Sequence, residues 1–167
     1  MKILILVRHA KSSWKDTSLP DHLRPLNKRG KRDGPAMGER LARRGVDADL
    51  VISSPTVRAM MTAKAFAREI GYPSAEIVAD ERLYEADASD LLEVIQELDD
   101  ALECVLLFGH NPGLTDLAND LANDLAVDVA NIPTCGIVEL QFDTNTWTHI
   151  GELDPIQVDF DYPKKID

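Results

Sequence analysis

The sequence predicts an α/β fold in which helices cover both faces of a mostly parallel central sheet, giving three layers. Two observations support this prediction: short continuous apolar runs recur along the chain, and between them apolar residues repeat with helical spacing. Continuous apolar runs are typical of strands that are buried on both faces. Because the chain has 167 residues, we expect one domain over residues 1–167.

Four apolar runs are the expected strands of the parallel part of the sheet. They cover residues 3–7, 50–53, 76–79 and 104–108. The first and last of these are continuously apolar, as expected for buried strands covered on both faces. Residues 137–142 and 147–153 flank the turn sequence Asp-Thr-Asn-Thr and predict a C-terminal hairpin. We expect residues 154–167 to form a loosely packed tail.

Capping residues and apolar spacing mark four helices. Asn27 is expected to cap a helix that ends near Gly45, and Ser54 with Pro55 is expected to begin another that Gly71 ends. The other two begin near Ser89 and after Pro112, and their expected inward-facing residues are Leu91, Ile95, Leu98 and Leu102, and Leu114, Leu117, Ala118, Leu121 and Leu125.

Charge and cysteine content argue against several classes of partner. The 29 acidic and 18 basic residues give a formal charge of −11, and a nucleic-acid partner would require a basic surface. No apolar run approaches the length of a membrane span, so we expect no membrane partner either. Cys104 and Cys135 have no metal-ligand spacing, which argues against a disulfide or zinc framework and predicts a cytoplasmic protein.

Polar residues follow three of the expected strands at the point where each strand ends. Arg8 and His9 follow the first, Arg58 lies in the first turn of the helix after the second, and His110 follows the fourth. Each alone has an ordinary structural interpretation. Because the carboxyl ends of parallel strands meet at one edge of a sheet, we expect all four side chains at one site. Helix N-termini at the same edge would add partial positive charge, so the sequence predicts a phosphate site.

These residues stand in motifs that resemble those of the histidine phosphatase superfamily, which has the phosphoglycerate mutase-like fold. The segment "RHAKSSW" is similar to the family's first motif at Arg8, His9, Ser12 and Trp14, "SSPTVRA" supplies its second arginine and "LLFGHNPG" its second histidine. The segments "LYE", ending at Glu85, and "NIPTCG" are also similar to the family's. The chain departs from the pattern at Ala10, where Gly is usual, and at Lys15, where the mutases usually have Asn.

Phosphoryl transfer explains why these residue types are needed. The guanidinium groups of Arg8 and Arg58 match the oxygens of a phosphate, and a protonated His110 would add another donor. Neutral His9 is the expected nucleophile, forming a transient phosphohistidine that water hydrolyses. By the resemblance Ser12 is a further phosphate-binding residue. With so much cationic charge from the chain itself, we expect no metal and no cofactor.

The leaving group needs a proton, and Glu85 is the candidate general acid. Glu85 lies in the acidic stretch "ADERLYEADASD", so Asp80, Glu81 and Asp87 are alternatives, as is a merely solvated charge. A leaving imidazole that is already protonated would depend less on such an acid.

The resemblance also suggests a class of substrate. Mutases and many small-molecule phosphatases of this superfamily carry a long insertion before the second histidine, whereas residues 71–103 hold little material for a lid. The "RHAKSSW" start and residues 24–33 look like the SixA-type phosphohistidine phosphatases. We therefore predict a metal-independent phosphatase for phosphoprotein, with phosphohistidine as the leading substrate. A small phosphate ester is the alternative, and a non-catalytic phosphoprotein-binding module is disfavoured by His9. The negative net charge predicts a neutral or basic surface around the partner's phosphosite.

Overall fold

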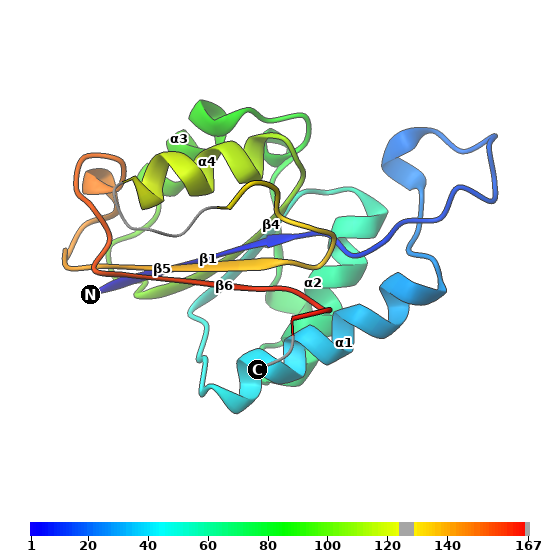
Figure 1. Ribbon diagram of the computed structural model, residues 1–167, viewed down its shortest axis with the longest axis horizontal. Helices are drawn as coiled ribbons and strands as arrows, with labels where there is room; N and C mark the ends of the chain where they lie inside the picture. The colour runs from blue at the N-terminus through cyan, green and yellow to red at the C-terminus, as the bar shows by residue number, and fades with distance from the viewer. Residues whose placement is uncertain (124–128, 166–167) are drawn as a thin grey trace.

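A six-stranded sheet forms the centre of the molecule (Figure 1). The computed structural model describes residues 1–123 and 129–165. The strands are β1 (Lys2–Arg8), β2 (Leu50–Ser53), β3 (Val78–Ala79), β4 (Cys104–Gly109), β5 (Ile137–Phe142) and β6 (Gln157–Asp161). Their order across the sheet is β3-β2-β4-β1-β5-β6. The pairs β3–β2, β2–β4 and β4–β1 are parallel, whereas β1–β5 and β5–β6 are antiparallel. The predicted mostly parallel sheet is therefore confirmed.

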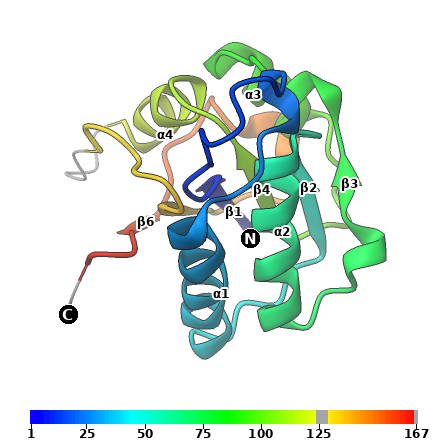
Figure 2. The same ribbon diagram turned by 90° about the vertical axis from the view of Figure 1, so that its right-hand side faces the viewer.

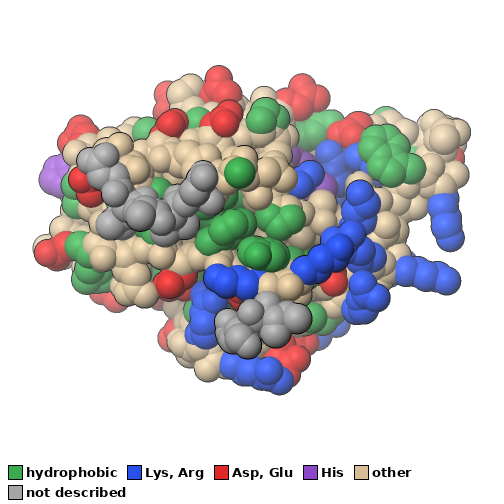
Figure 3. All heavy atoms as spheres, viewed as in Figure 1, with side chains coloured by type: hydrophobic (Ala, Val, Ile, Leu, Met, Phe, Trp, Pro, Cys, Tyr) green, Lys and Arg blue, Asp and Glu red, His purple; other side chains and the backbone are tan. Residues whose placement is uncertain are grey.

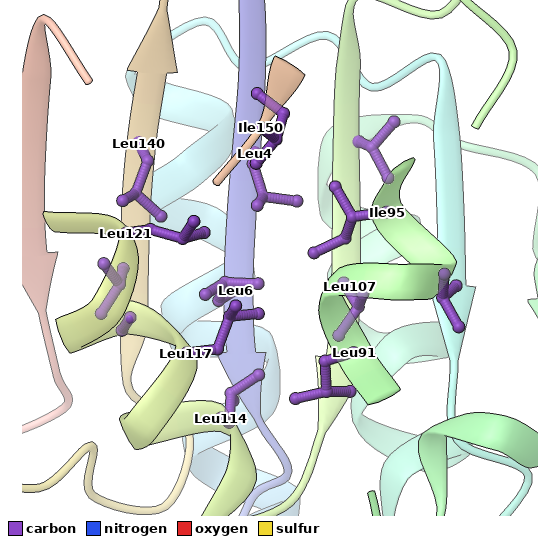
Figure 4. Close-up of a cluster of buried hydrophobic side chains, with 14 of the residues drawn as sticks. Leu4, Leu6, Leu91, Ile95, Leu107, Leu114, Leu117, Leu121, Leu140 and Ile150 are labelled. Atoms are coloured by element: carbon purple, nitrogen blue, oxygen red, sulfur yellow. The ribbon is translucent and has the colours of Figure 1, made fainter. Parts of the chain in front are cut away.

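Helices cover both faces of this sheet. Helices α1 (Lys28–Arg43) and α2 (Val57–Ile70) lie on one face, and α3 (Ala88–Gln96) and α4 (Gly113–Ala122) lie on the other (Figure 2). Figure 4 shows leucines of α3 and α4 packed over the leucines of β1, β4 and β5. No helix in the described ranges is both long and apolar enough to cross a membrane.

Side chains of β1 alternate between the two layers of the core. Leu4 and Leu6 belong to the cluster under α3 and α4, while Ile5 and Val7 belong to the cluster under α1 and α2. This alternation is the period of two that any strand imposes on its side chains. Because both faces are covered, all four residues are apolar and fully buried. The three predicted layers are thus confirmed.

Some predicted helix ends are confirmed and others are wrong. The Asn27 side chain accepts a hydrogen bond from the Gly30 amide and caps α1, and Gly71 ends α2 at a φ of 77°. Helix α2, however, begins at Val57, because Thr56 and not Ser54 caps it. Helix α3 is capped by Asp87 rather than Ser89, in a reciprocal capping box with Asp90. The predicted inward residues Leu98 and Leu102 lie beyond the end of α3, and Leu125 lies outside the described residues.

The predicted C-terminal hairpin has a different second strand. Residues 147–153 do not pair with β5; Trp147–His149 is a 3₁₀ turn, and the Trp147 side chain is fully buried with its Nε1 donating to the Leu102 carbonyl. On the side away from β1, the strand that pairs with β5 is β6. It lies within residues 154–167, so the prediction that this segment is a loosely packed tail is wrong for β6. Alternation of Val158 and Phe160 with polar neighbours is the signal that identifies this half-buried strand.

Candidate active site

The carboxyl ends of β1, β2 and β4 meet at a pocket of about 340 Å³. Arg8 is the last residue of β1, and His9 follows it. Arg58 lies in the first turn of α2, and His110 directly follows β4. The structure brings all four residues together in the wall of this pocket, although they are separated by up to about a hundred positions in the chain.

His9 is held in one tautomer and orientation. Its Nδ1 lies 2.7 Å from the carbonyl oxygen of Ala10. A carbonyl only accepts hydrogen bonds, so Nδ1 carries the proton and Nε2 keeps a free lone pair. The Ala10 amide in turn donates to Thr62 Oγ1 at 2.9 Å, which fixes the backbone that holds the ring. This is the arrangement that a nucleophilic imidazole requires.

The environment of His9 favours its neutral form. Burial lowers the pKa of His9 to about 4; the hydrogen bond to Ala10 opposes this, and the positive charges of Arg58 and Arg8 reinforce it. At neutral pH the imidazole is therefore uncharged.

His110 lies beside His9, with ring centroids 5.1 Å apart. Its Nε2 is 2.8 Å from Ser54 Oγ and 3.4 Å from Thr56 Oγ1. Burial lowers the pKa of His110 to about 3, and repulsion from a protonated His9 and from Arg58 adds to this effect. The protonated His110 expected from the sequence would thus require the negative charge of a bound phosphate to offset these effects. Ser54, expected to cap a helix, instead contacts this imidazole.

Arg8 and Arg58 both line the pocket, and each has a buried donor atom. Arg8 donates from Nη1 to the Ile132 carbonyl at 3.0 Å, and Arg58 donates from Nη1 to the Asp21 carbonyl at 2.8 Å. The Nε atoms of Arg8 and Arg58 are buried and have no hydrogen-bond partner among the described residues. Buried donors without partners are costly and rare. Two of them in one pocket point to an anion that accepts from both.

Asp21 and Arg24 line the pocket but were not predicted as site residues. The Asp21 carboxylate accepts hydrogen bonds from Arg58 Nη2 at 2.9 Å and from the Tyr84 hydroxyl at 2.6 Å. Arg24 is buried, donates to Ser12 Oγ at 3.0 Å and stacks on the ring of Trp14 with its guanidinium carbon 3.5 Å from the centroid. Arg24 begins the segment 24–33 that resembles the SixA-type phosphatases, whereas the only local signal for Asp21 is the Asp-x-x-Arg spacing, which is common on protein surfaces.

The other two predicted site residues also line the pocket. Ser12 is buried, and its oxygen accepts from Arg24, so its own hydrogen is the group it can offer to a phosphate. Glu85 is exposed at the pocket wall and has a φ of 56°. A non-glycine residue in this left-handed region carries strain of about 1 kcal/mol, which is common at functional sites.

The alternative carboxylates to Glu85 do not line the pocket. Asp80 pairs with Arg82, Asp87 caps α3, and Glu81 begins a 3₁₀ turn. Glu85 is the one of the four that faces the site. Within residues 1–123 and 129–165, no three His, Cys, Asp or Glu side chains form a group that could hold a metal ion.

Comparison with known sequences identifies the family. The sequence model of the histidine phosphatase superfamily (branch 1) matches residues 4–103. An uncharacterized chloroplastic protein of Arabidopsis thaliana is 31% identical over 152 residues, which cover 86% of this chain and 68% of that protein. The 2,3-bisphosphoglycerate-dependent phosphoglycerate mutase of Methylobacterium sp. (strain 4-46) is 35% identical over 96 residues, covering 54% of this chain but only 44% of the mutase.

Solved structures show the same fold over nearly the whole chain. A SixA protein from Agrobacterium tumefaciens aligns with a TM-score of 0.80 and 26% identity, covering 97% of this chain and 98% of that one. The protein histidine phosphatase SixA complexed with tungstate aligns with a TM-score of 0.76 and 20% identity, covering 96% and 94%. The fold is therefore phosphoglycerate mutase-like, as predicted, and this chain belongs to the histidine phosphatase superfamily.

Proposed function

We propose that this protein is a phosphatase that removes the phosphoryl group from phosphorylated protein, with phosphohistidine as the leading substrate, through a covalent intermediate on His9. The observation that carries this proposal is the hydrogen bond from His9 Nδ1 to Ala10, which leaves Nε2 free. Two arginines line the same pocket, and the Nε atom of each has no hydrogen-bond partner among the described residues. A site built only to bind phosphate would not need a nucleophile between its arginines.

The reaction has two displacements. First, the lone pair of His9 Nε2 attacks phosphorus while the N–P bond of the substrate breaks. If the substrate ring carries a proton on its other nitrogen, the electron pair of that bond leaves with a neutral imidazole, and no further acid is needed. Arg8 and Arg58 stabilise the charge on the equatorial oxygens.

In the second displacement, the oxygen of a water molecule attacks phosphorus and the bond to His9 Nε2 breaks. The electron pair returns to Nε2, and inorganic phosphate is released. Glu85, in the pocket wall, can accept the proton of the attacking water. The same carboxylate would serve as the acid in the first step when the leaving group is an alkoxide.

The segment between α2 and β4 supports a protein substrate. Helix α3 in this segment buries Leu91, Val94 and Ile95 against the core, and only Tyr84 and Glu85 of the segment line the pocket. No part of residues 71–103 therefore folds over the site as a lid that would enclose a small substrate. The similar SixA protein of A. tumefaciens is named as a phosphohistidine phosphatase, which points the same way.

A small phosphate ester is the second candidate substrate. It is favoured by the phosphoglycerate mutase relatives, whose similarity covers about half of this chain. In that case a carboxylic acid would have to protonate the leaving oxygen, and Glu85 would be essential.

Initial rates on both classes of substrate test the proposal. We expect wild-type protein to hydrolyse a phosphohistidine peptide at a kcat/KM at least about tenfold above those of a panel of small phosphomonoesters. The variant His9→Ala should lose about 10³-fold or more on every substrate, whereas the control His149→Ala, which changes an exposed histidine outside the pocket, should not. A preference for small esters would refute the protein substrate, and an active His9→Ala would refute the nucleophile.

A further inference from the structure

The charges of this acidic chain are strongly segregated. Residues 1–44 contain twelve of the 18 Lys and Arg residues but only four of the 29 Asp and Glu residues. These residues form β1, the loop that follows it, and α1. The part of the molecule that carries Arg8 and His9 is therefore basic, while the remainder is acidic.

Five of these cations lie on the loop after β1 and the start of α1, and we call them the cationic surface: Lys11, Lys15, Lys28, Arg29 and Lys31. Lys11 lines the pocket itself, and the other four line a groove between the loop and α1. The same loop lines both, through Ser12 in the pocket and Ser13 in the groove. Figure 3 shows Lys and Arg side chains gathered over this end of α1 and its loop, while acidic side chains gather over α3 and α4.

Neither ion pairs within the described ranges nor the stability of α1 accounts for the lysines of this surface. Arg29 and Arg32 pair with Asp33, but within the described ranges none of the four lysines forms an ion pair. Lys28 and Lys31 are the first and fourth residues of α1, and no acidic residue lies in the first turn of this helix. Cations at a helix N-terminus oppose the helix dipole, so the stability of α1 does not account for them.

The surface around the start of α3, which reaches the pocket at Glu85, is acidic. Glu81, Glu85, Asp87 and Asp90 are exposed in and just before α3, and Glu85 lines the pocket. A bound substrate therefore meets positive charge toward α1 and negative charge toward α3. Such a rim favours a partner with one charged face in one orientation, and disfavours a long polyanion that would extend across both sides.

We propose that the cationic surface docks an acidic protein surface that lies beside the partner's phosphorylated residue. This inference rests on the proposed function and names its partner: a phosphoprotein with Asp and Glu residues on one side of its phosphosite. It is the opposite of what the net charge predicts. Since exposed charges are screened beyond about 10 Å at ordinary ionic strength, the local surface decides recognition and the total charge of −11 does not.

Charge reversal at two lysines tests this docking surface. In K28E/K31E the new carboxylates favour the N-terminus of α1, so the fold should be kept and its melting temperature unchanged or raised. The matched control K164E/K165E makes the same change of net charge at two exposed lysines. The control lysines lie far from the tested ones. They follow Pro163, whose carbonyl accepts a hydrogen bond from Arg40, and Arg40 lies about 18 Å along α1 from Lys28.

The probes are two synthetic peptides, one rich in Glu and one rich in Lys, each with a single phosphohistidine. We expect the wild-type protein to prefer the Glu-rich peptide in kcat/KM. K28E/K31E should lose about tenfold on it at low ionic strength and about twofold at high salt, whereas K164E/K165E should lose less than twofold. Fluorescence anisotropy with the unphosphorylated Glu-rich peptide measures docking without turnover, and the same lysine dependence is expected.

The outcomes separate docking from catalysis. Equal or better use of the Lys-rich peptide, equal binding by K28E/K31E and its control, or tighter binding of a single-stranded oligonucleotide than of the Glu-rich peptide would each overturn the docking surface. Lysine-dependent binding of the Glu-rich peptide without any hydrolysis of phosphohistidine would support docking and refute the proposed function. Hydrolysis of both peptides at equal rates would support the function and refute docking.

Discussion

Asp21 and Arg58 form an ion pair inside the pocket, with Asp21 Oδ2 and Arg58 Nη2 2.9 Å apart. The hydrogen bond from Tyr84 and those from Arg58 hold the pKa of Asp21 well below its usual range, and the same bond raises the pKa of Tyr84. Asp21 is therefore charged at neutral pH. If the pocket binds phosphate as proposed, this carboxylate is a second anion on Arg58 and competes with the phosphate for its guanidinium group.

Replacement of Asp21 by Asn should tighten the binding of oxyanions. Asn keeps an oxygen that can accept from Arg58 but removes the negative charge, so repulsion of a bound phosphate falls. We expect the inhibition constant of inorganic phosphate to fall about fivefold, with a smaller fall in kcat because Arg58 is held less firmly. Tyr84→Phe, which keeps the charge of Asp21, is the control. An unchanged or weaker affinity for phosphate in Asp21→Asn would contradict this role.

Arg8 should matter far more for activity than for stability. Burial lowers the pKa of Arg8, its Nε has no partner among the described residues, and its side chain makes one hydrogen bond to Ile132. Arg8→Met should reduce kcat/KM by about 10³-fold yet change the free energy of unfolding by less than about 1 kcal/mol. Urea unfolding checks this. A loss of more than about 3 kcal/mol would show that Arg8 is chiefly structural.

The importance of Glu85 should depend on the leaving group. In Glu85→Gln we expect kcat for an alkyl phosphate, which needs a proton on the leaving oxygen, to fall about 10²-fold. With p-nitrophenyl phosphate or phosphohistidine the fall should be a few-fold. Asp87→Asn, which changes a helix cap outside the pocket, serves as control. Equal losses on all substrates would rule out a role specific to protonation of the leaving group.

The two pocket histidines should titrate at unusually low pH. The pKa of His9 is lowered to about 4 and that of His110 to about 3, while an unfolded chain has about 6.5. As pH falls, the two histidines bind protons in the unfolded state before they do so in the folded state. The stability that depends on their neutral form is therefore present in full above about pH 6.5 and is lost progressively toward pH 3. The imidazole resonances of His9 and His110 in NMR spectra should therefore not move between pH 8 and 5.5. A midpoint well above pH 7 for His9 would disprove the neutral nucleophile.

Gly30 is required for the close approach of α1 to the loop that holds Ser12. A Cβ on Gly30 would lie 2.2 Å from the Lys11 carbonyl oxygen, whereas a Cβ on Gly34 would lie 3.2 Å from the Ala65 Cβ. We expect Gly30→Ala to cost roughly 2–4 kcal/mol in unfolding free energy and to lower kcat/KM, because the backbone must move. Gly34→Ala should stay within about 1 kcal/mol, since better helix propensity offsets the tight contact. Equal stabilities for the two variants would contradict this account.

Much of the site could be predicted because strand ends are visible in the sequence. The apolar run before Arg8 and the one before His110 identify buried parallel strands, and such strands bring their carboxyl ends to one edge. The family was confirmed by the match over residues 4–103. The helix starts at Ser54 and Ser89 were wrong because neighbouring residues also have capping side chains, and only the backbone geometry selects among them.

The sequence by itself determined the order of strands and helices and the four residues at the strand ends, since periodicity and position along the chain define both. Only the tertiary structure decided that Asp21 meets Tyr84, 63 positions away, and that β6 rather than residues 147–153 pairs with β5. It also decided that the lysines of α1 share a groove with the loop that lines the pocket. Contacts of this kind depend on how loops pack after the sheet has formed, and no local pattern encodes that packing.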